Sequence, residues 1–270
     1  MLCIARVCFK VKSLKRREVK MEMQSSNPTL NEKTFGQARV GVGEPAMTIQ
    51  GTVNKTFILL AVLVAAAAWT WSKTSDPSAA GFVQVTFIGS MIVGFILAIA
   101  TSFKPKWSPI TAPLYAACEG LLLGILSAYF EMRYPGIVMQ AVGLTFAVTF
   151  AMLMGYKAGW LQATPGLRKG LMIAMGGIMI FYVVVWIASM FGIHPPGFLN
   201  GGGPLGIAFS LFVVGIASMS LILDFDLIES YSREGVGKYM EWYGAFALMV
   251  TLVWLYMEIL RLLSKINRRN

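Results

Sequence analysis

The chain has 270 residues, of which 56% are hydrophobic and only 13% are charged, about half the charged share of a typical soluble domain. This composition excludes a soluble fold for most of the chain and predicts lipid as the solvent for much of its surface. The net charge of +10 would suit nucleic acid, but ten of the 23 Lys and Arg precede Thr56 with few aromatic residues among them. A base-stacking surface is therefore not expected. We expect instead a basic tail that is attracted to anionic lipid.

The first part of the chain has the composition of a flexible segment. Residues 21–54 are rich in Ser, Asn, Gly and Gln, so residues 1–54 are predicted to form a disordered, basic, cytoplasmic tail, and residues 55–270 a transmembrane domain. The cysteines Cys3, Cys8 and Cys118 form no CxxC pair. No disulfide, metal site or cofactor is predicted.

Seven apolar stretches approach or exceed the roughly 20 residues that cross a bilayer. They are separated by short connections rich in Pro and Gly, which predicts an all-α, seven-helix transmembrane bundle. The expected spans are Thr56–Trp71, Phe82–Phe103, Ile110–Phe130, Ile137–Tyr156, Leu171–Ile193, Leu205–Leu223 and Trp242–Leu263.

The positive-inside rule gives the expected orientation. With the amino terminus in the cytoplasm, 17 of the 23 Lys and Arg fall on the inner side and six on the outer side. Four of these six lie at the carboxyl end, at Arg261, Lys265, Arg268 and Arg269. Either the early loops dominate the orientation or the last segment does not fully cross; full crossing is the preferred interpretation.

Three acids fall within or against the spans: Glu119, Asp224 and Glu258. A charge at the centre of a membrane helix costs about 2.5–3.5 kcal/mol, so such residues face the bundle interior or a wet cavity. At a rise of about 1.5 Å per residue, Glu119, Asp224 and Thr251 can share one layer, with Glu258 about two turns above Thr251. Because the charge of a buried acid depends on its protonation, this arrangement predicts a pH-sensitive gate or a proton relay.

Each of these residues also has a structural interpretation. Glu119 and Asp224 can be protonated acids that bond a neighbouring helix, Glu258 can pair with Arg261, and Thr251 can bond back to its own helix. Four acids that follow the sixth span are expected in a solvated inner loop, with a cation-attracting vestibule as the alternative: Asp226, Glu229, Glu234 and Glu241.

Three segments resemble those of a known family. SPITAPLYAACEGLLLG, LILDFDLIE and AFALMVTLVWLYMEILRLL are similar to the third, sixth and seventh spans of the Bax inhibitor-1 family, over residues 55–263. The opening SSNPTL and the ending WLYMEILRLL resemble a bacterial branch, which implies the bacterial inner membrane as the location. The resemblance also implies that the last helix is central.

The family resemblance further implies a leak of cations, chiefly calcium, that is gated by pH through two aspartates on the sixth and seventh helices. Asp224 matches the first of these. Thr251 stands at the second, so the paired acid is either absent or replaced by Glu258 or Glu119. The second span, Phe82–Phe103, contains no Lys or Arg where the family has a basic partner.

Two alternative functions are therefore considered. One is a pH-sensitive cation leak or transporter that uses Asp224, Glu119 and Glu258; the other is a non-conducting regulator that binds membrane proteases or other membrane proteins. An enzyme is not expected, because the chain has no GxSxG, HExxH or phosphate-loop motif, and its single histidine, His194, lies in a Pro/Gly-rich loop.

Overall fold

The computed structural model describes residues 45–192 and 201–268. In this part of the chain the secondary structure is helical apart from one isolated β-bridge. The helices are α3 (Ile49–Thr74), α4 (Ala80–Phe103), α5 (Ser108–Arg133), α6 (Ile137–Lys157), α7 (Pro165–Met190), α9 (Pro204–Arg233) and α10 (Met240–Asn267), with 3-10 turns η1 (Pro77–Ala79) and η2 (Pro105–Trp107).

All seven of these helices are long and apolar enough to cross a bilayer, which confirms the predicted all-α membrane fold. The main error concerns the sixth span. It was expected to end at Leu223, but α9 continues for ten more residues to Arg233. The expected inner loop is therefore mostly helix, and only the turn 234–239 separates α9 from α10.

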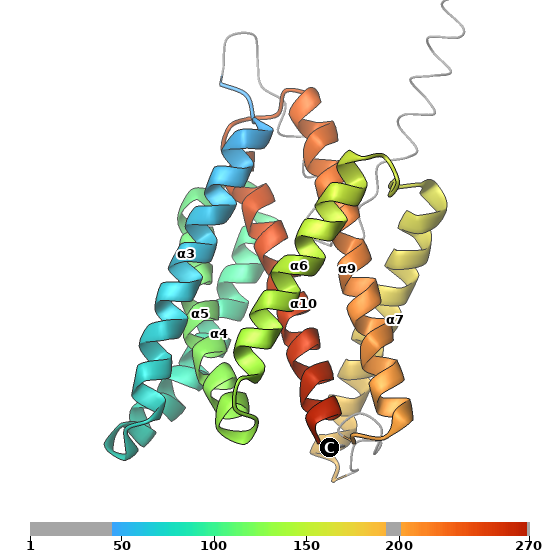
Figure 1. Cartoon of the computed structure of the whole chain (residues 1–270). Coiled ribbons are helices and arrows are strands. Elements are labelled where there is room, and N and C mark those ends of the chain that lie inside the picture. The colour runs from blue at the N-terminus through green and yellow to red at the C-terminus, as the bar shows by residue number, and fades with distance from the viewer. Residues whose placement is uncertain (1–44, 193–200, 269–270) are drawn as a thin grey trace, which may run out of the picture.

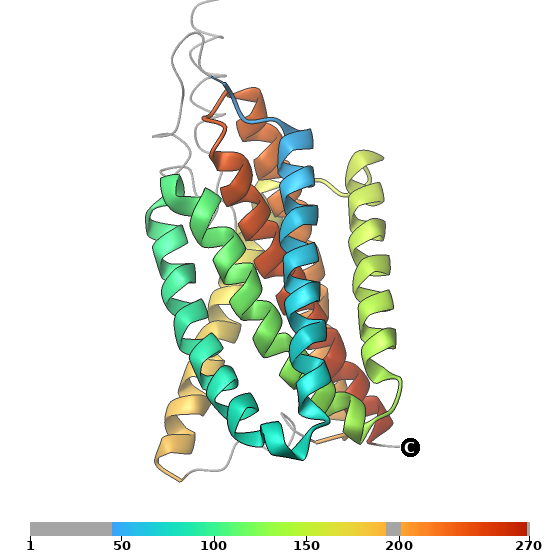
Figure 2. The same ribbon diagram turned by 90° about the vertical axis from the view of Figure 1, so that its left-hand side faces the viewer.

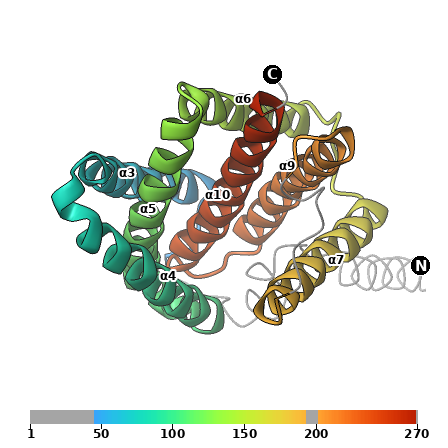
Figure 3. The same cartoon turned by 90° about the horizontal axis from the view of Figure 1, so that it is seen from below.

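The helices form a bundle with two ends, here named as Figure 1 shows them. The upper end carries the start of α3 and the turn between α9 and α10; the lower end carries the end of α10 and the turn between α5 and α6. Helix α10 contacts α3, α5, α6 and α9. Seen from below, α10 runs between α5 and α9, and α7 lies beyond α9 (Figure 3).

Close packing of α3 on α5 depends on two glycines one turn apart. A Cβ at Gly120 would lie 2.2 Å from the Leu63 carbonyl oxygen, and one at Gly124 would lie 2.3 Å from that of Ala67. The backbones therefore approach through small residues, as in many membrane helix pairs. Figure 2 shows α3 crossing in front of α5 and α10.

The outer faces of the bundle are apolar. Helices α4 and α7 have the smallest buried shares of the seven, and large side chains such as Phe95, Phe103, Ile173 and Met179 are exposed on them. In water such a surface would aggregate. It fits contact with lipid, which leaves the polar groups between the helices as the candidates for function.

Helix α3 begins at Ile49, seven residues earlier than the expected first span. Thr48 caps it by accepting a hydrogen bond from the Gly51 amide at 2.9 Å, so residues 49–54 are helical. Residues 1–44 of the predicted tail lie outside the described residues, as does His194.

Candidate functional site

At the centre of the bundle Asp224 on α9 meets Thr251 on α10. The Thr251 hydroxyl donates to the Asp224 carboxylate at 2.7 Å, and the same oxygen lies 3.2 Å from the Ala247 carbonyl of its own helix. Asp224 is 0% exposed. The two residues therefore occupy one layer, as their distances from the α9–α10 turn led us to expect. The geometry is compatible with the expected bond of Thr251 to its own helix, and its part in an ion pathway stays a prediction.

Glu119 does not join this pair. Its hydrogen-bonding neighbour is Tyr115, one turn earlier on α5, and α5 borders α10 rather than α9. The predicted site residue that the structure brings to Asp224 is Thr251, through their hydrogen bond. Glu119 is thus a separate, half-buried acid and not the second member of the pair.

Glu258 is held at the lower end of α10. It is 2% exposed, and Arg261, one turn later, donates to its carboxylate at 2.9 Å. Arg261 in turn lies over the Tyr182 ring of α7, with 5.6 Å from the guanidinium carbon to the ring centroid. The expected ion pair at the rim is present, and it links α10 to α7.

Asp226 and Glu229 were expected in a solvated loop, and this expectation was wrong. Both lie on α9, where Asp226 forms an ion pair with Arg168 of α7 and Glu229 one with Arg233. The Tyr156 hydroxyl of α6 donates to Glu229 at 2.7 Å and lies 3.4 Å from Asp226. This cluster joins α6, α7 and α9 near the upper end of the bundle.

Glu241 was also expected in that loop, and this expectation was wrong. It stands in the first turn of α10 and is 2% exposed. Its carboxylate accepts from the Thr48 amide at 3.0 Å, from the Thr48 hydroxyl at 2.9 Å, and from the Lys55 ammonium. A Cβ at Gly51 would lie 2.2 Å from the same carboxylate, so only glycine leaves room for it.

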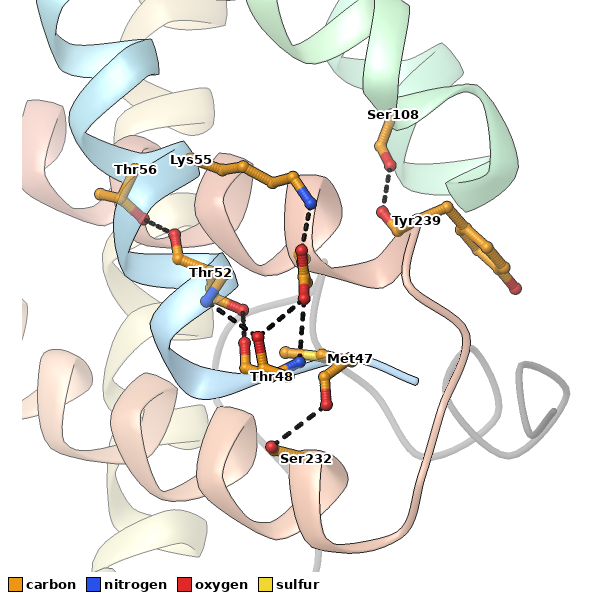
Figure 4. Close-up of polar contacts among 10 residues, drawn as sticks. Met47, Thr48, Thr52, Lys55, Thr56, Ser108, Ser232 and Tyr239 are labelled. Carbon is orange, nitrogen blue, oxygen red and sulfur yellow. Dashed lines mark hydrogen bonds and ion pairs between the residues drawn. The ribbon is translucent and has the colours of Figure 1, made fainter. Parts of the chain in front are cut away.

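The segment before α3 completes this contact, which we call the upper clamp: residues 45–48, Lys55 and Glu241. The Met47 amide donates to the Val236 carbonyl at 2.6 Å. The Ser232 hydroxyl donates to the Met47 carbonyl at 3.3 Å (Figure 4). Sequence reasoning missed the clamp, because its partners are 193 residues apart. The capping pattern of a threonine before an apolar helix was the only local signal.

Chemically, these groups can bind or release protons and attract cations, but they do not resemble a resident metal centre. In the described part of the chain, no group of three or more His, Cys, Asp or Glu is placed to hold a metal ion. Cys118 is a free, partly buried cysteine.

The chain was compared with known families and proteins. Residues 22–268 match the family model described as Bax inhibitor 1 like. No curated protein and no solved structure matches the chain.

Proposed function

Since the chain belongs to the Bax inhibitor 1-like family, we propose that this integral membrane protein is a pH-sensitive cation leak, with calcium the first cation to test. The gate in this proposal is the contact between Asp224 and Thr251. The observation that carries it is a fully buried carboxyl bonded across two membrane helices at 2.7 Å. Intramembrane acids of this kind are costly and are usually kept for function.

The acids at the upper end support an entry route for cations. Asp226 and Glu229 lie two and five residues beyond Asp224 on α9, and both remain partly exposed. Acidic groups at the mouth of a pore raise the local concentration of cations, and here that effect requires the ion pairs with Arg168 and Arg233 to open. We propose that this end faces the cytoplasm of a bacterium, because the segments that the sequence assigns to this side hold 17 of the 23 Lys and Arg.

The test is calcium flux into liposomes that contain the purified protein and a trapped calcium dye, at stepped pH. We expect wild-type flux that changes with pH, and flux in Asp224→Asn that is lower and no longer changes. Glu258→Gln should alter flux less, because Arg261 already holds that carboxylate. Thr251→Asp introduces a facing acid and should make the pH response steeper.

A second candidate is a non-conducting regulator that binds other membrane proteins. One observation favours it: the lower end of α10 carries Arg261, Lys265 and Arg268 beside Arg133 of α5, and a cationic mouth repels cations. Flat traces for wild type at every pH, together with a membrane protein that co-purifies at fixed stoichiometry, would replace the leak by this function.

We further propose that the chain has no catalytic activity. An aspartyl protease needs two carboxyl groups about 3 Å apart that share a proton. Here Asp224 accepts a hydrogen bond from a threonine, and Asp226 is bound to Arg168. Incubation of the purified protein with membrane-protein substrates should give no cleavage in wild type or in Asp224→Asn.

The orientation has its own test. Single-cysteine variants Lys73→Cys at the lower end and Lys106→Cys at the upper end, in a background without native cysteines, report the two sides. In intact cells a membrane-impermeant maleimide should label the first variant and not the second. The reverse pattern would invert the proposed topology.

A further inference from the structure

A cavity of about 390 Å³ lies at the lower end of the bundle, between the last turns of α5 and α10. All four charged residues in its lining are cations. The lining residues are Tyr129, Phe130, Arg133, Tyr134, Arg261, Ser264, Lys265 and Arg268. The cavity lies away from Asp224 and takes no part in the proposed gate.

The positive charge of this cavity is only partly offset. Arg261 is paired with Glu258, but Arg133 forms no ion pair with any of the residues described. The nearby acid Glu131 points to the start of α6, where its carboxylate accepts from the Gly136 amide at 2.6 Å. A net excess of cations therefore faces the cavity.

Lys265 is the strongest sign of a built site. It is 7% exposed, and its ammonium donates to the Ser210 hydroxyl at 2.8 Å and to the Gly206 carbonyl at 3.1 Å, both of α9. These acceptors are neutral, and an ammonium has three N–H donors. The Glu258 carboxylate also interacts electrostatically with Lys265, but it is already paired with Arg261, so one carboxylate serves two cations. A buried cation that is only partly compensated is costly, and a further anion beside it would lower that cost.

Cations in the last turn of a helix also offset the helix dipole. That effect is sufficient to explain Arg133 at the end of α5, or Lys265 at the end of α10, taken alone. It does not explain four cations from two helices around one cavity, with tyrosine and serine hydroxyls among them. Guanidinium groups with hydroxyl donors form the usual protein site for a phosphate group.

We propose that this cavity binds the phosphate group of an anionic phospholipid. Its position at the end of two membrane-crossing helices puts it at the depth of lipid headgroups, and Tyr129, 65% exposed, has the amphipathic side chain typical of that interface. Basic pockets between membrane helices are known binding sites for anionic headgroups. The bound phosphate would join α5 to α10 and, through Lys265, to α9.

The test measures binding and not ion flux, so it does not depend on the proposed leak. Protein in neutral detergent is titrated with dioleoyl-phosphatidylglycerol, with the zwitterionic dioleoyl-phosphatidylcholine, and with inorganic phosphate at constant ionic strength. Bound lipid is counted by native mass spectrometry, and the thermal midpoint is recorded in parallel. The test variant is Arg133→Gln/Arg268→Gln; both residues are exposed, so we expect the variant to fold.

We expect wild type to bind the anionic lipid with a rise in thermal midpoint, and the double variant to bind it about 30-fold more weakly, for two lost cations at the membrane surface. Lys73→Gln removes one positive charge at the same end without lining the cavity and should bind as wild type does. If inorganic phosphate saturates the site and the lipid does not bind, the ligand is free phosphate and the proposal of a phospholipid ligand is overturned. Equal binding by wild type and double variant, or equal binding of phosphatidylcholine, would overturn the site itself.

Discussion

The upper clamp gives the sharpest test of the fold. Glu241→Ala removes three hydrogen bonds and leaves Lys55, whose side chain is only 15% exposed, without its carboxylate. Loss of one partner of a buried ion pair costs about 3–5 kcal/mol. Glu241→Gln keeps an oxygen acceptor for the two Thr48 donors but loses the charge, so we expect about 1.5–3 kcal/mol, the usual value for one hydrogen bond to a charged group.

The assay is equilibrium unfolding in mixed micelles of a mild detergent and dodecyl sulfate, followed by far-UV circular dichroism. A double-mutant cycle with Lys55→Met isolates the pair, because the buried charge is absent from the double variant; a coupling energy of about 0.5–3 kcal/mol is expected. The matched control is Lys106→Met, which removes an exposed lysine from the same end. The reasoning would be refuted if the free energy of unfolding of Glu241→Ala lay within about 0.5 kcal/mol of the wild-type value. It would also be refuted if the effects of the two single variants simply added in the double variant.

Three further predictions concern the bundle. Gly120→Ala places a Cβ 2.2 Å from a backbone oxygen of α3 and should lower the free energy of unfolding by about 1–3 kcal/mol, whereas Gly143→Ala, with open space at its Cβ, should be neutral. Thr251→Val should lower it by about 0.6–1.7 kcal/mol, and Thr251→Ser should not, in the same unfolding assay. Arg168→Gln should speed hydrogen exchange in the first turn of α7, while Lys169→Gln, at the exposed next position, should leave it unchanged.

The number, type and order of the helices could be predicted because each span is a continuous apolar run, and lipid permits few other structures for such runs. The ends were harder to predict. Hydropathy falls at Lys55 and at Asp224, so both spans were cut there, but a helix ends where its backbone bonds end. Thr48 and Arg233 mark those points in the structure.

Contacts between residues far apart in the sequence were the hardest feature to predict. Asp224 and Thr251 were placed in one layer by arithmetic, because both are measured from the same short turn. Glu241 could not be placed in this way, since its partner Thr48 is separated from it by six helices. Glu241 was therefore expected to be solvated because it lies beside a loop. In the structure its carboxylate occupies the space that Gly51 leaves by lacking a side chain.

The threonine at position 251 limits how pH can act on this chain. Two carboxyl groups that face each other repel when both are ionised, so loss of a proton can push two helices apart. Thr251 donates to Asp224 and carries no charge, so this repulsion is absent at that contact. A pH response would then have to come from the hydration of one buried acid, with a shallow, one-proton dependence. A steeper response in Thr251→Asp than in wild type would fit this account, and an equally steep response in both would show that another pair of acids forms the gate.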